Sequence, residues 1–257
     1  MNLFQTIIFG ALSGFFHLTP LSWFGHLSII QYFWGDFNAS AALLTLIDVA
    51  LLLAIVIYFY KDLWRLIRHP RQRYTFIALC AALAGVVVGI FFHNISQGLM
   101  VYPWLSVAFL AVTAAVIWFT GNYHGKKRAI DLSIPESFII GLLGMLCLLP
   151  GMSFPAIILF LVMSRGVSKQ SAIKFTYIIM VPILLGMTLG NWYDTLFLTG
   201  TFTVGIPEGI AAMVAGLTGF VGIHLTKTLI EKRKYHRFAI YCAVVILLTA
   251  GALLLGM

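Results

Sequence analysis

The sequence predicts an all-α integral membrane protein with a single membrane domain over residues 1–257. Apolar residues make up 61% of the chain and charged residues 9%, and the mean hydropathy is +1.01. A soluble domain carries roughly 25% charged residues, so this chain has too few to cover a surface that faces water. Long apolar stretches also recur along its whole length. These observations favour a bundle of helices that crosses a bilayer.

Six segments are predicted to be transmembrane helices. A helix needs about 20 mostly apolar residues to cross the hydrocarbon core of a bilayer. The segments that meet this requirement are roughly 41–60, 74–93, 101–120, 174–193, 207–227 and 238–256. The three cysteines are scattered and form no CxxC pair, so neither a disulfide framework nor a zinc site is expected.

The positive charges lie in a few segments and indicate the orientation of the chain. All sixteen Lys and Arg residues fall in four patches, which are Lys61 to Arg73, Lys126 to Arg128, Arg165 to Lys174 and Lys227 to Arg237. The loops on the other side, around Asp36, around Asn94 and from Asp194 to Glu208, contain none. Basic loops usually stay in the cytoplasm, so we expect a multi-pass protein of the inner (plasma) membrane with these patches cytoplasmic. The net charge of +8 then reflects topology and contact with membrane lipids, and no nucleic-acid partner is expected.

Two further apolar stretches, 2–34 and 136–165, are interrupted by proline. The interruptions read GFFHLTPLSWFGH around Pro20 and GMLCLLPGMSFPA around Pro150. Proline removes a backbone donor and clashes with the preceding turn, so each helix is expected to break there. Paired broken helices in two halves of a membrane protein point to a binding site near the midplane. Because an odd number of crossings separates them, we predict two inverted-repeat re-entrant helical hairpins; two ordinary proline-kinked helices are the alternative.

Polar residues gather at the first break. His17, Ser22 and His26 surround Pro20 within apolar sequence. A hairpin tip exposes backbone N–H groups where its second helix begins, which favours anion binding, and Ser22 is expected to be the N-cap of that helix. A histidine there could donate to a phosphate, shuttle a proton or activate a hydroxyl. Each histidine could instead be a hydrogen-bonded core residue.

The other candidates are less concentrated. The second break offers Ser153 and the backbone of Gly151 but no charge. Asp48 lies in the middle of a predicted span, where a carboxylate is costly unless it is paired or protonated, and is therefore a functional candidate. A purely structural pairing of Asp48 with a histidine or serine is the alternative. The candidate substrate-binding residues are Ser22, His26, Ser153, Gly151 and Asp48.

The whole chain resembles the undecaprenyl-pyrophosphate phosphatase family, membrane enzymes that recycle the polyprenyl carrier of cell-wall synthesis and confer bacitracin resistance. The first family motif, roughly EGxTEFLPVSSTGH, aligns with residues 13–26, and Gly14, Pro20, Ser22, Gly25 and His26 match it. The second motif, PGxSRSxxT, aligns with residues 150–158, and Pro150, Gly151 and Ser153 match it. The resemblance implies six transmembrane helices with two inverted re-entrant hairpins and a polyprenyl or other lipid phosphate as ligand. Whether the chain forms a homodimer is left open by the resemblance.

The chain departs from both motifs where the family has its reactive groups. Ser13 and His17 stand at the positions of the two motif glutamates, and Phe154 stands at that of the arginine. Pyrophosphate hydrolysis needs cations or a metal ion to stabilise the charge of the transition state. The Mg²⁺ or Ca²⁺ site that the family motif could form is therefore expected to be lost, and no metal or other cofactor is expected.

Two functions remain open on this basis. The favoured one is a protein that binds a lipid phosphate and moves it between the leaflets of the membrane with little hydrolysis. The alternative is an active lipid diphosphatase that recycles undecaprenyl pyrophosphate, with His26, Ser22 and His17 as its catalytic residues. In either case, phosphate binding is expected to depend on His17 and His26 and to strengthen as the pH falls and imidazole becomes protonated.

Overall fold

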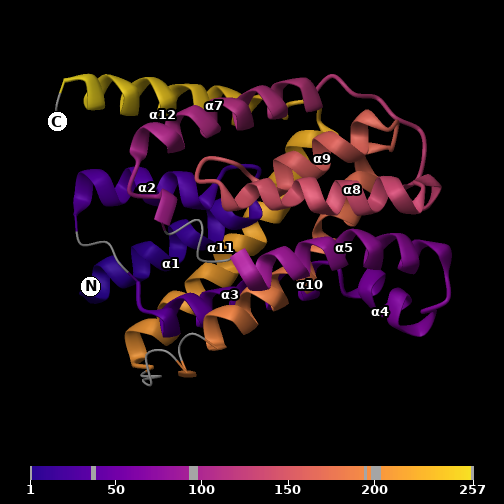
Figure 1. The fold of residues 1–257 in the computed structure, drawn as a ribbon, viewed down its shortest axis with the longest axis horizontal. Coiled ribbons are helices and arrows are strands. Elements are labelled where there is room, and N and C mark those ends of the chain that lie inside the picture. The colour runs from indigo at the N-terminus through magenta and orange to yellow at the C-terminus, as the bar shows by residue number, and fades with distance from the viewer. Residues whose placement is uncertain (1, 36–38, 93–97, 194–195, 198–203, 256–257) are drawn as a thin grey trace.

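A computed structural model describes residues 2–35, 39–92, 98–193, 196–197 and 204–255, and its regular elements are helices (Figure 1). Two 3-10 helices, η1 (Ala129–Asp131) and η2 (Met145–Leu148), flank α8. The α-helices are α1 (Leu3–Leu18), α2 (Trp23–Trp34), α3 (Ala41–Tyr58), α4 (Tyr60–Arg68), α5 (Arg73–Phe92), α7 (Pro103–Thr120), α8 (Ile134–Gly144), α9 (Phe154–Ser164), α10 (Lys169–Tyr193), α11 (Ile206–Glu231) and α12 (His236–Leu254). The predicted all-α class is confirmed.

Among the residues that the structure describes, five helices are long and apolar enough to cross a membrane. They are α3, α7, α10, α11 and α12, and they coincide with five of the six expected spans. The sixth expected span, 74–93, coincides with α5, whose side chains are described only as far as Val87, and residue 93 lies outside the described residues. The crossing of α5 therefore stays a prediction. The chain has the helices of a multi-pass integral membrane protein.

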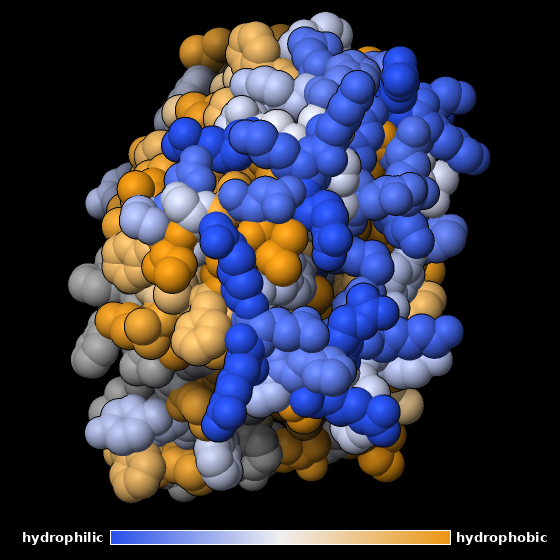
Figure 2. Space-filling model, turned by 90° about the vertical axis from the view of Figure 1, so that its right-hand side faces the viewer, coloured by the Kyte–Doolittle hydropathy of each residue, from blue (hydrophilic) through white to orange (hydrophobic). Residues whose placement is uncertain are grey.

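The basic segments gather at one end of the bundle. Figure 2 shows hydrophilic side chains collected on the side of the molecule where α4 lies in Figure 1. Hydrogen bonds join three of the four basic patches there. Lys174 Nζ donates to Asp62 Oδ1 at 2.9 Å, and the Lys127 N–H donates to the Gly166 carbonyl at 3.0 Å. Asp36, Asn94 and Asp194, which mark the expected opposite loops, lie outside the described residues.

Small residues bring α1 and α11 into close contact in the middle of the bundle. Gly10 and Gly14 of α1 lie against the backbone of Ala211 and Ala215 of α11. A Cβ atom at Gly14 would meet the Ala215 carbonyl oxygen and the Thr218 hydroxyl. In membranes, such small residues four positions apart let two helix backbones approach and gain dispersion contacts. This contact fixes α1, whose last turn leads into the first proline break.

Gly14→Ala is expected to lower the apparent melting temperature of the purified protein, because the added methyl group would push α1 away from α11. Overpacking of this kind costs about 1–3 kcal/mol. Gly251→Ala in α12 is the matched control, since a Cβ atom there has no neighbour within 4 Å. It should leave the melting temperature unchanged or slightly raised, as alanine favours the helix. Equal melting temperatures for the two variants would contradict the close contact.

Candidate functional site

The chain reverses direction at both proline breaks. The first turn, residues 19–22, joins α1 to α2, and the second turn, residues 149–153, joins η2 to α9. In Figure 1, α1 and α2 extend from their turn towards the left, whereas α8 and α9 extend towards the right. Ser22 is the N-cap of α2, and its Oγ accepts a hydrogen bond from the backbone N–H of Gly25 at 3.2 Å. The predicted capping role of Ser22 is confirmed.

The two turns meet inside the bundle. Ser22 Oγ also accepts a hydrogen bond from the backbone N–H of Gly151 at 3.0 Å. Ser153 Oγ donates a longer bond, of 3.5 Å, to the Thr19 carbonyl. Gly151 has φ of +108°, which disfavours any residue with a Cβ atom. A Cβ atom at Gly25 would lie 2.7 Å from Gly151 Cα, so glycine permits the close approach. The expectation that the breaks lie together is confirmed.

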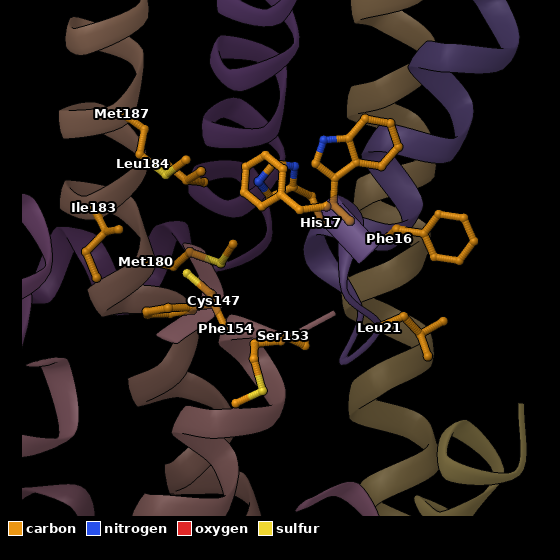
Figure 3. Close-up of a pocket in the computed structure, with 13 residues that line it drawn as sticks. Phe16, His17, Leu21, Cys147, Ser153, Phe154, Met180, Ile183, Leu184 and Met187 are labelled. Atoms are coloured by element: carbon orange, nitrogen blue, oxygen red, sulfur yellow. The ribbon is translucent and has the colours of Figure 1, made fainter. Parts of the chain in front are cut away.

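A small cavity of about 30 Å³ lies beside this contact (Figure 3). Its polar lining consists of His17 and Ser153, and the rest is apolar, including Cys147, Phe154 and Met180. Figure 3 shows His17 opposite Cys147, Phe154 and Met180, while Phe16 points away from them. Ser153 is the N-cap residue of α9 but makes no side-chain bond to the first turn, so it leaves those amides uncapped. His17 Nδ1 is buried without a hydrogen-bond partner. We call this space the tip cavity.

A second cavity, of about 40 Å³, borders the tip cavity and shares His17, Trp23, Phe24 and Met187 with it. Its polar lining is Ser13 and His17 from α1, Asp48 from α3 and Asn191 from α10. Asp48 Oδ2 accepts a hydrogen bond from Asn191 Nδ2 at 3.0 Å. Asp48, expected to contact substrate, therefore lies one cavity away from the turns. His17 lines both spaces. We call this space the Asp48 cavity.

His26 occupies a different environment from His17, although the two flank the same proline. Its ring stacks on Phe16 with a centroid distance of 4.0 Å and on Tyr241 with one of 5.6 Å. Its Nδ1 lies 2.7 Å from the Ser22 carbonyl oxygen. His26 is not among the residues that line the tip cavity or the Asp48 cavity. The structure thus brings Ser22, Gly151 and Ser153 together and packs His26 beside them among aromatic rings.

Three polar residues that support the site were not expected from the sequence. The Thr113 hydroxyl donates to the Gly151 carbonyl at 2.7 Å, and the buried Tyr177 hydroxyl donates to the Leu18 carbonyl at 2.6 Å. These bonds hold the second turn and the end of α1. Asn191 is the hydrogen-bond partner of Asp48. The signal that could have found them is a polar side chain inside an apolar span, because such groups need a partner in a membrane.

The residues at the turns do not fit the divalent ion that the family motif could hold. Mg²⁺ and Ca²⁺ prefer several oxygen ligands, usually with at least one carboxylate. In the part of the chain that the structure describes, the tip cavity is lined by neither Lys, Arg, Asp nor Glu. Ser13 and His17 stand where the motif has glutamates, and the carboxylate of Asp48 lines the other cavity. Hydrogen-bond donors, not cations, are what the tip cavity can offer an anion.

Comparison with known proteins gives a consistent match. The sequence model of the family described as "Bacitracin resistance protein BacA" matches residues 6–248. An undecaprenyl-diphosphatase of Desulforudis audaxviator is 25% identical over 251 residues, covering 94% of each chain. Undecaprenyl-diphosphatase 1 of Shouchella clausii is 26% identical over 265 residues, which cover 96% of this chain and 95% of the relative. An undecaprenyl-diphosphatase of Methanococcus vannielii is 27% identical over 248 residues, which cover 93% of this chain and 95% of the relative. These matches confirm the resemblance inferred from the two motifs.

Ser22→Ala is expected to destabilise the protein markedly, because it would leave the N–H groups of Gly25 and Gly151 without their acceptor. Loss of an N-cap costs about 1 kcal/mol, and each unsatisfied buried donor costs about 1–3 kcal/mol. Ser153→Ala is the matched control, since it removes a single bond of 3.5 Å. Thermal unfolding followed by tryptophan fluorescence should place Ser22→Ala well below Ser153→Ala. The reverse order would contradict the bridging role of Ser22.

Proposed function

The chain belongs to the family of the bacitracin resistance protein BacA, and we propose that it binds a polyprenyl or other lipid phosphate where its two turns meet. We further propose that it moves this lipid between the leaflets of the inner membrane, with little hydrolysis. In this proposal the two helix pairs are re-entrant hairpins related as an inverted repeat. Their opposite directions in Figure 1 support that arrangement, which is typical of alternating-access transporters.

The proposal rests on the lining of the tip cavity, which offers hydrogen-bond donors and, within the described part of the chain, includes neither Lys nor Arg. The amides at the start of α9 and the Ser153 hydroxyl can hold phosphate oxygens, because a helix N-terminus favours an anion. His17 Nδ1, buried without a partner, can hydrogen-bond a phosphate from the opposite wall. The remainder of the lining, from Cys147 to Met187, is apolar. At about 30 Å³ the cavity has room for little more than water, so a prenyl chain would have to displace these side chains.

Efficient hydrolysis of a diphosphate is disfavoured by the same lining. The leaving phosphate must be stabilised by positive charge, and the loss of a single such donor costs about 10²–10³ in rate. Phe154, at the motif arginine position, is 5% exposed and packs inside the bundle. The motif arginine, which could stabilise this charge, is replaced by Phe154, and the two carboxylates that could hold a metal ion are replaced by Ser13 and His17. Because catalytic groups act as a unit, little of the family mechanism should remain.

A lipid diphosphatase with an altered site is the second candidate, and the names of the relatives favour it. It would use Ser22, His26 and His17. A serine nucleophile needs its hydroxyl within hydrogen-bond reach of the base. Here the His26 ring reaches the Ser22 carbonyl, whereas Ser22 Oγ is engaged by the N–H groups of Gly25 and Gly151. This geometry makes Ser22 a structural residue and weakens the second candidate.

The unmodified protein is expected to release phosphate from undecaprenyl pyrophosphate weakly or not at all, with little stimulation by Mg²⁺ or Ca²⁺. A family member with both motifs intact, assayed in parallel, is the positive control. Phe154→Arg alone should not restore turnover, because the motif carboxylates would still be missing. His17→Ala should weaken binding of a lipid phosphate. Robust, metal-stimulated turnover that survives His17→Ala would refute the proposal and establish a diphosphatase.

The orientation can be tested with single cysteines in a variant lacking Cys80, Cys147 and Cys242. A cysteine at His69, between α4 and α5, should react with a membrane-impermeant maleimide only after the cells are opened. A cysteine at Ser40, the N-cap of α3, should react in intact cells. The physical reason is the clustering of basic residues at the α4 end, which is expected to stay cytoplasmic. The opposite labelling pattern would invert the proposed topology.

A further inference from the structure

The Asp48 cavity encloses a carboxyl group whose described surroundings contain no cation. Asp48 is 5% exposed, and the other polar groups that line the cavity are Ser13, His17 and Asn191. Asn191 donates to Asp48 Oδ2, but an amide supplies a dipole and no counter-charge. A cavity needs about 10–15 Å³ to hold a water molecule. At about 40 Å³, the Asp48 cavity is large enough for water to link these side chains.

The titratable groups on the neighbouring helices leave His17 as the partner of Asp48. On α3 and α11, Tyr58 and His224 are paired at the far end, with Oη and Nδ1 3.3 Å apart. Glu208, at the start of α11, accepts from the Gly205 N–H at 2.9 Å. On α4 and α10, Lys174 pairs with Asp62 and the Tyr177 hydroxyl donates to the Leu18 carbonyl. None of the titratable groups described on these two helices lines the Asp48 cavity. Within the described residues, His17 is thus the titratable group that shares a cavity with Asp48.

We propose that Asp48 and His17 together form a proton-binding site that is linked to phosphate binding in the tip cavity. An isolated ionised carboxylate is costly inside a membrane protein and is avoided by pairing or protonation. One proton bound by the pair makes it neutral, with Asp48 as the carboxylic acid and His17 as the uncharged imidazole, because a low-dielectric interior disfavours two separate charges. Release of that proton to water leaves the pair with a net charge of −1.

The link to phosphate follows from the position of His17, and this part rests on the proposed function. His17 lines both cavities, so the charge of the pair acts directly on an anion in the tip cavity. The protonated pair is neutral, whereas the deprotonated pair repels phosphate at low dielectric, where charges interact strongly. Phosphate should therefore bind more weakly as the pH rises and the pair loses its proton. By reciprocity, a bound phosphate should make the pair hold its proton more tightly.

The Asp48→Asn variant isolates the effect of Asp48 ionisation on phosphate binding from the ionisation of the phosphate itself. Asparagine keeps the shape of the side chain and its hydrogen bond with Asn191, but the pair then stays uncharged when no proton is bound. We compare the affinity of the unmodified protein for farnesyl phosphate with that of Asp48→Asn at each pH. Above the pH at which the pair loses its proton, the ratio of the first affinity to the second should fall by up to about tenfold for each further pH unit. The phosphate's own ionisation affects both proteins equally. Asp62→Asn, which removes a carboxylate at the polar end of the bundle, should behave like the unmodified protein.

Binding of farnesyl phosphate to the purified proteins across a pH series distinguishes the outcomes. If the affinity of the unmodified protein, divided by that of Asp48→Asn, falls as the pH rises, the inference is supported. A ratio that stays constant overturns it while leaving the proposed phosphate site intact. If neither protein binds farnesyl phosphate at any pH, the proposed function fails, and the proton site is then decided by spectroscopy alone.

Infrared difference spectroscopy of the unmodified protein provides that second measurement. A buried protonated carboxylic acid gives a carbonyl band separate from the amide bands. This band should disappear on raising the pH and should be missing from Asp48→Asn but present in Asp62→Asn. Absence of a titrating band in the unmodified protein would overturn the proton site, even if Asp48→Asn failed to fold.

Discussion

The contact between the two proline turns is the interaction on which the rest of the structure depends. A broken helix leaves backbone donors unpaired, and a bilayer offers no water to satisfy them. Ser22 Oγ pairs the N–H of Gly25 on its own side and the N–H of Gly151 on the other. The first turn therefore supplies the acceptor for the Gly151 N–H of the second turn, and the second turn supplies the Ser153 hydroxyl as a donor to the Thr19 carbonyl of the first. The α1–α11 packing and the Thr113 bond then hold the two turns in register.

This contact is built from backbone groups, one hydroxyl and glycines, so it does not depend on the residues that perform chemistry. The motif positions that match the family are those that shape the turns, among them Pro20, Ser22, Gly25 and Gly151. The positions that differ, such as His17 and Phe154, lie on the cavity walls. A change of wall residues can therefore alter charge and function while the turns keep their geometry. Membership of the family and loss of its hydrolytic groups are physically compatible.

The sequence predicted those features that local patterns determine. Hydropathy located five of the six expected spans, proline located the breaks, and a serine after proline identified the N-cap Ser22. Features that depend on how helices rotate against one another were not predictable. His17 and His26 flank the same proline, yet α1 turns one towards two cavities and α2 turns the other into an aromatic stack. The Asp48–Asn191 bond joins residues 143 positions apart, and no periodicity encodes such a pairing.

The tip cavity and the Asp48 cavity are linked by the net charge of the residues that line them. In a low-dielectric interior each charge acts strongly on its neighbours, so a wall without cations accepts an anion only through dipoles and hydrogen bonds. Such a wall suits a lipid monophosphate better than a diphosphate, which brings more negative charge and requires compensation. It also makes the ionisation of one nearby carboxyl group decisive. An arginine at position 154 would compensate the negative charge of an ionised Asp48, whereas Phe154 carries no charge. In the proposed site, the proton on the Asp48–His17 pair therefore determines whether the cavity walls are neutral or repel an anion.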